Sequence, residues 1–207
     1  MSSLLQEQLQ EWERFKANRR AQLKRTDFTI ISSDCIGATI YRDLGLPYLS
    51  PTINLTVFVP DFLKLVEDLS YYIAQPLLPL DSTEKISYPR GLLGDIAINF
   101  VHYNTFEEAK AAWERRKARI NWDNLFFICT DTGWCPYHML QHFDNLPYPH
   151  KVIFTYKAYP EFSSSFRLPG FEDLEELGDT ISFRPGPLLR RYLDSFDYIS
   201  FLNGEWP

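Results

Sequence analysis

The sequence lacks the long apolar run of a membrane-spanning helix. No stretch of its 207 residues approaches the roughly 20 apolar residues that cross a bilayer. The opening segment, MSSLLQEQLQEWERF, carries charges where a secretory signal peptide has its apolar centre. We therefore expect a cytoplasmic protein with no transmembrane segment, and peripheral contact with the inner membrane face as the one membrane role left open.

Positive charge is also in deficit, because 27 acidic residues outweigh 21 basic ones and give a net charge of -6. A chain of this sign has no general attraction to nucleic acid, so we expect no nucleic-acid partner. The three cysteines are an odd number without a CxxC pair or His-rich spacing, which predicts reduced thiols and no metal centre. Glycine-rich phosphate loops and the GxSxG element are absent as well, which disfavours dinucleotide, P-loop and serine-hydrolase functions.

The patterns that are present predict an α/β fold, a mixed and mostly parallel sheet flanked by helices. A loop or weak hairpin around 77–90 could separate two small α/β lobes. We expect an amphipathic helix over 1–25 and one α/β domain over 26–207. Apolar periodicity and turn signals place helices near 4–24, 36–44, 61–73, 106–120 and 137–146, and strands near 28–32, 52–60, 95–103, 124–131 and 151–157.

The N-terminal helix has two interpretations. Its apolar residues recur at helical spacing, and its second half is rich in arginine and lysine. Such a helix could bind the membrane surface or a partner protein. The simpler interpretation, which we favour, is a helix docked on its own domain with a solvated basic face.

Polar side chains follow several predicted strands. Because parallel strands bring their carboxyl ends to one sheet edge, where ligands bind in open α/β proteins, we expect these side chains to converge on one cleft. The candidate catalytic residues are Asp34, Cys35, His102 and Asp131. The candidate substrate-binding residues are Ser33, Arg115, Arg116, Cys135 and His138.

Each candidate also has a plain structural explanation. At a helix N-terminus Cys35 would have a lowered pKa and could act as a nucleophile with His102 or His138 as base, but it could equally pack as a small hydrophobe. Asp131 could be catalytic, or bind a divalent cation together with Asp95, or simply begin a turn. Arg115 and Arg116 could hold a diphosphate, or belong to a solvated helix face.

Several long blocks resemble the bacterial DUF1919 family, whose members are often labelled exopolysaccharide or capsule biosynthesis proteins. They are ISSDCIGATIYRDLGLPYLSPTINL, YPRGLLGDIAINFVHYNTFEEAKAAWERRKARINWDNLFFICTD and FDNLPYPHKVIFTYKAYP. The resemblance runs from about residue 26 to the C-terminus and implies an α/β protein. The family's first block reads more like ISNNCWGG, so SSDCIGA keeps Cys35 and Gly37 and replaces the asparagines and the tryptophan.

Three functional hypotheses follow. The first is a transferase of surface-polysaccharide biosynthesis that acts on a sugar, a nucleotide sugar or a sugar-linked carrier, with no cofactor identified. The second is a non-catalytic accessory protein that binds a polysaccharide synthase or the membrane surface through the N-terminal helix. The third, a metal-dependent nuclease or phosphodiesterase, is the weakest because the acidic chain lacks a phosphate-tracking surface.

Overall fold

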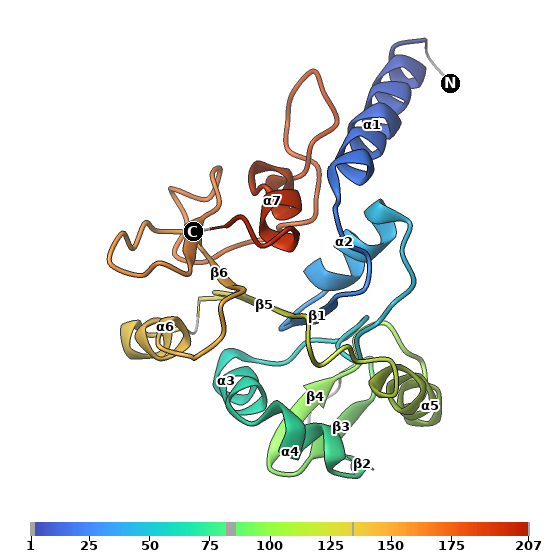
Figure 1. Cartoon of the computed structure of the whole chain (residues 1–207), viewed down its shortest axis with the longest axis vertical. Coiled ribbons are helices and arrows are strands. Elements are labelled where there is room, and N and C mark those ends of the chain that lie inside the picture. Colours follow the sequence, from blue (N-terminus) through green and yellow to red (C-terminus); the bar gives the residue numbers. More distant parts are fainter. Residues whose placement is uncertain (1–2, 82–85, 134, 207) are drawn as a thin grey trace.

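A four-stranded parallel sheet lies at the centre of the computed structural model, which describes residues 3–81, 86–133 and 135–206 (Figure 1). Every neighbouring pair in this sheet is parallel, which confirms the predicted α/β class. The strands, in spatial order, are β1 (Thr29–Ser32), β5 (Leu125–Thr130), β6 (Lys151–Thr155) and β7 (Ser165–Arg167).

A second, antiparallel sheet lies beneath the first. It consists of β2 (Leu77–Pro79), β3 (Arg90–Leu93) and β4 (Ile96–Asn99). The strand predicted near 52–60 is wrong, since this segment makes only an isolated bridge from Thr56 to Asn99. Its extended path is interrupted at Asn54, where φ is 62°.

Helices cover both faces of the parallel sheet (Figure 1). The helix predicted over 61–73 is two helices, because the chain bends at Asp68, whose side chain accepts a hydrogen bond from the Tyr71 amide and begins the second one. One face is covered by α2 (Ile36–Leu44), the 3-10 turn η1 (Tyr192–Ser195) and α7 (Tyr198–Leu202). The helices on the other side are α3 (Val59–Glu67), α4 (Leu69–Ala74), α5 (Phe106–Lys117) and α6 (Tyr137–Asp144).

Alternating side chains of the parallel strands supply two hydrophobic cores. Ile30 and Phe126 point towards α2 and α7, whereas Ile31 and Phe127 point towards α3 and α6. Ile98 of β4 belongs to this second core. The second of these two cores is therefore shared by the parallel and the antiparallel sheet.

The N-terminal helix α1 (Ser3–Gln22) docks on the segment that precedes α7 through residues near its middle. The Trp12 ring lies edge-on to Phe183, with centroids 5.5 Å apart. The Arg190 guanidinium contacts both Glu11 carboxylate oxygens, at 2.7 and 2.8 Å. In contrast, Leu4 and Leu9 near the start of the helix are 63% and 40% exposed. Among the described residues, no helix has the length and apolarity needed to span a membrane.

Replacing Trp12 by alanine should lower the free energy of unfolding by about 2 kcal/mol, because the indole is 7% exposed and packs on Phe183. The matched control is Leu9→Ala on the same helix, where the side chain is already 40% exposed and little apolar burial is lost. Urea unfolding followed by circular dichroism measures both changes. Equal midpoints for the two variants would show that the docking of α1 contributes nothing to stability.

Candidate functional site

Buried backbone contacts fix the carboxyl ends of β1 and β5 side by side. The Thr130 amide donates a hydrogen bond to the Ser33 hydroxyl at 3.1 Å. The Val57 amide donates to the Ser33 carbonyl at 2.8 Å, and Ser33 is only 3% exposed. Ser33 thus joins three segments at the sheet edge and supports the site from beneath.

Asp34 turns the chain from β1 into α2. Its Oδ1 accepts hydrogen bonds from the Ile36 amide at 2.9 Å and from the Ser32 hydroxyl at 3.3 Å. This is a short-range cap of a kind that Asp and Asn favour. Burial raises the pKa of the Asp34 carboxyl above its usual range, and the charge of Asp179 raises it further.

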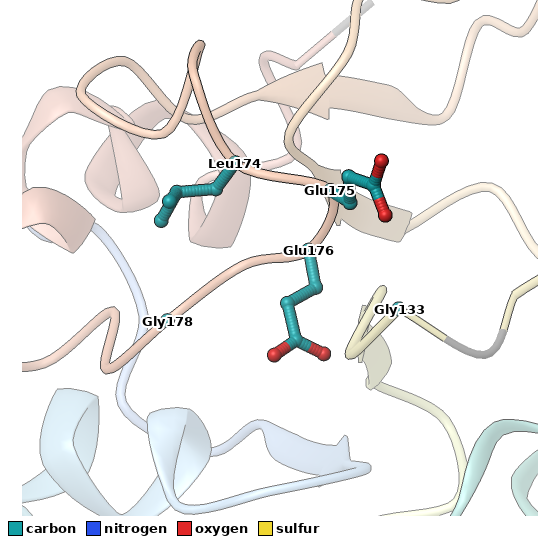
Figure 2. Close-up of a pocket in the computed structure, with 5 residues that line it drawn as sticks. All are labelled: Gly133, Leu174, Glu175, Glu176 and Gly178. Atoms are coloured by element: carbon teal, nitrogen blue, oxygen red, sulfur yellow. The ribbon is translucent and has the colours of Figure 1, made fainter.

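Two adjoining hollows open at this edge, and we call them together the acidic cleft. They share Gly178 and have volumes of about 490 and 220 Å³. The larger is lined by Gly133, Leu174, Glu175, Glu176 and Gly178, and the smaller by Asp34, Cys35, Ile36, Thr56, Gly178, Asp179, Thr180 and Ile181. Figure 2 shows Glu176 directed into the space beside the Gly133 turn and Glu175 pointing the other way.

The outer wall of the acidic cleft is the segment 171–181. Phe171 and Leu177 anchor it in the core under α2 and α7. Opposite, Gly133 has a φ of 83°, and a Cβ built there would lie 2.5 Å from the Glu176 carboxylate. Only glycine allows both this backbone conformation and the close approach of Glu176.

Asp131 lies at the same edge but beneath the surface. It is 2% exposed, and its Oδ1 accepts a hydrogen bond from the Gly133 amide at 3.0 Å. Burial raises the pKa of this carboxyl. Burial, followed by the charge of Asp131, also raises the pKa of the nearby Cys135 thiol. Asp131 therefore shapes the turn that carries Gly133.

Cys35 lines the smaller hollow at the start of α2, but its electrostatics differ from the expectation for a helix N-terminus. Burial, together with the charge of Asp34, raises the pKa of the thiol to about 11. At neutral pH the sulfur is protonated, so a thiolate nucleophile is not what this geometry favours.

The two candidate histidines lie apart from the residues that line the cleft. His102 follows β4, which belongs to the antiparallel sheet, and its side chain is exposed. His138 is exposed near the start of α6. Neither is among the residues that line the two hollows.

The arginines of α5 are not among the residues that line the acidic cleft. The Asn121 amide, just after α5, donates to the Thr29 hydroxyl at the first residue of β1. Arg116 is buried and donates to the Ile53 carbonyl at 3.2 Å and to the Tyr103 hydroxyl at 2.6 Å. Arg115 is exposed. The structure does not bring this cluster to the acidic cleft.

Asp95, the other carboxylate considered with Asp131 for a cation, lies after β3 and bonds to Lys64 Nζ at 2.8 Å and to the Tyr72 hydroxyl at 2.7 Å. It is thus engaged in the other sheet. Within the described parts of the chain, no group of three or more His, Cys, Asp or Glu side chains is placed to hold a metal ion.

The cleft wall at 171–181 was missed in the sequence because it has no regular periodicity. The one available signal is the acidic run FEDLEELGD, which ends in the Gly178 and Asp179 pair. A loop so rich in carboxylates next to a predicted sheet edge is a candidate wall of a binding site.

Comparison with known proteins agrees with the resemblance seen in the sequence blocks. The chain is 42% identical over 193 residues to an uncharacterized protein of Haemophilus influenzae, and the match covers 92% of each chain. The model of a domain of unknown function, DUF1919, matches residues 7–203, a range that begins inside α1. The chain is therefore a member of the DUF1919 family.

Proposed function

We propose that this protein is a transferase of exopolysaccharide or capsule biosynthesis that acts on a sugar or a sugar-linked carrier in the acidic cleft. The observation that carries the proposal is that Asp34 and Asp179 line one hollow at the carboxyl edge of a parallel sheet. We infer the pathway from the label that members of the family often carry. We infer the reaction from the side chains that line the acidic cleft.

The proposed chemistry uses Asp34 as a general base. Its raised pKa brings the carboxylate closer to the pKa that a base needs to accept a proton efficiently near neutral pH. In this mechanism a hydroxyl of the bound sugar, as the acceptor, attacks the electrophilic atom of an activated donor. The hydroxyl proton passes to Asp34, and the bond between the transferred group and the donor's leaving group breaks, with its electron pair departing on the leaving group. Carboxylates and backbone amides of the cleft are suitable partners for the other sugar hydroxyls.

The charge of the cleft narrows the substrate class. Asp179 adds negative charge beside Asp34, and Glu176 adds negative charge beside Asp131. Lys157 is a cation near Asp131, where its charge opposes the rise in pKa that burial causes. A diphosphate would meet net repulsion here. We therefore favour a neutral or amine-bearing sugar over a free nucleotide sugar.

A binding screen tests this proposal. Saturation-transfer NMR should detect contact of the wild-type protein with glucose, galactose, N-acetylglucosamine or glucosamine, and a weaker signal or none with UDP-glucose at low salt. Raising the salt concentration should strengthen UDP-glucose binding by screening the carboxylates. Binding of UDP-glucose alone, with no response to any free sugar, would contradict the proposed substrate class.

The accessory-protein hypothesis has one observation in its favour. Leu4 and Leu9 are exposed at the start of α1, where a partner could cover them. The docking of Glu11, Trp12 and Arg19 on the domain shows, however, that much of the helix is already engaged. We therefore keep the transferase as the leading proposal.

A further inference from the structure

A third hollow, with a different chemical character, adjoins the acidic cleft. It has a volume of about 280 Å³ and is lined by Phe58, Val59, Pro60 and Thr132. We call it the apolar hollow, because three of these four side chains are apolar. Val59 is 3% exposed and belongs to the core beneath the sheet, whereas the Phe58 side chain is 55% exposed.

Two segments of chain connect the apolar hollow to the acidic cleft. Thr132 lines the apolar hollow and Gly133 lines the cleft, and the Cα atoms of consecutive residues are about 3.8 Å apart. Thr56 lines the cleft and Phe58 the apolar hollow, which at roughly 3.3 Å per extended residue places them within about 7 Å. The residues that line the two hollows are therefore close together along both segments.

Phe58 is among the large apolar side chains that the described part of the chain leaves exposed. Phe58 occupies the N-cap position of α3, and no side-chain hydrogen bond caps this helix. Ser, Thr, Asp and Asn are the usual residues at this position. An exposed phenylalanine beside an apolar hollow provides apolar surface that a ligand in the hollow can cover.

We propose that the apolar hollow binds the hydrocarbon part of the ligand whose sugar occupies the acidic cleft. The ligand is then an amphipathic glycoconjugate, a sugar attached to a hydrocarbon chain, and Phe58 determines the preference for the chain. This inference rests on the proposed function, because the sugar end is placed by the acidic cleft. The choice of occupant follows from the short chain separation between residues that line a polar hollow and residues that line an apolar one.

Two glucosides that differ only in their aglycone test the inference. Hexyl β-D-glucopyranoside, used below its micelle concentration, is expected to bind about tenfold or more tightly than methyl β-D-glucopyranoside, because burial of several methylenes strengthens binding. Phe58→Ser should reduce the affinity for the hexyl glucoside to that for the methyl glucoside and leave the latter unchanged. Titrations followed by amide chemical shifts measure both constants.

The control is Tyr71→Ser, which removes an aromatic side chain of similar exposure, 51%, from the distant helix α4. It should keep the preference for the hexyl glucoside. Equal affinities of the wild type for the two glucosides, or a hexyl preference that survives Phe58→Ser, would overturn the inference. Binding of the hexyl glucoside through Phe58 without any binding of the methyl glucoside would support the apolar hollow and count against the sugar site.

Discussion

Replacing Arg191 by alanine is expected to lower the free energy of unfolding by about 3–5 kcal/mol, the largest effect that we predict for one side chain. Its guanidinium contacts the Asp43 carboxylate of α2 and lies 3.1 Å from Asp194 Oδ1. Arg191 and Asp43 are 4% and 5% exposed, so removal of the arginine leaves the Asp43 carboxylate buried without that counter-ion. Urea unfolding measures the change.

Two further variants separate this cause from a general loss of packing. Asp43→Leu combined with Arg191→Met removes the buried Arg191–Asp43 pair and its desolvation penalty, while Asp194 keeps Arg19 Nη1 at 3.4 Å as a counter-ion, so the double variant should recover part of the lost stability. Lys24→Ala breaks the exposed pair with Glu205 and should change the unfolding midpoint little. A double variant no more stable than Arg191→Ala would contradict the electrostatic explanation.

Replacing Asp34 by asparagine should weaken sugar binding strongly while leaving the fold intact. The asparagine oxygen can still accept from the Ile36 amide, so the start of α2 is preserved. Loss of a charge-assisted hydrogen bond to the sugar should weaken binding by about 1.5–3 kcal/mol, or roughly 10- to 150-fold. The matched control is Asp68→Asn, which changes the cap of α4 outside the cleft and should leave binding unchanged.

The same variant has a pH signature. Since the pKa of Asp34 is raised in the folded state, the protonated carboxyl contributes stability that is fully present below the unfolded pKa and is lost as the pH rises through the folded pKa. Asp34→Asn removes this dependence. The stability of the variant relative to the wild type should therefore increase as the pH rises from about 4 towards neutrality. A constant difference across this range would contradict the raised pKa.

Apolar periodicity and turn residues predicted those helices and strands whose formation depends on residues close together in the sequence. The helix expected over 36–44 is α2, and the helix expected near 106–120 is α5, which begins after Thr105, whose hydroxyl accepts a hydrogen bond from the Glu108 amide. Such features depend on residues within one turn of each other. The parallel sheet also followed from the alternation of strands and helices.

Features that depend on distant contacts could not be predicted in this way. Arg115 and Arg116 are neighbours in a basic run, yet only Arg116 is buried, because its guanidinium meets the Ile53 carbonyl 63 residues away. The predicted strand near 95–103 gave no sign that it would pair antiparallel with β3, and this places His102 away from the parallel edge. The cleft wall likewise depends on the packing of Phe171 and Leu177.

The most direct test of the account is a map of backbone amide chemical shifts during titration with the free sugar that binds best in the screen. We predict that the shifts concentrate at the Gly133 turn and at residues 178–181, which line the acidic cleft, and that they disappear in Asp34→Asn. Shifts confined to α1 and the neighbouring segment 183–190, or shifts that persist unchanged in Asp34→Asn, would contradict a sugar site at the carboxyl edge of the sheet.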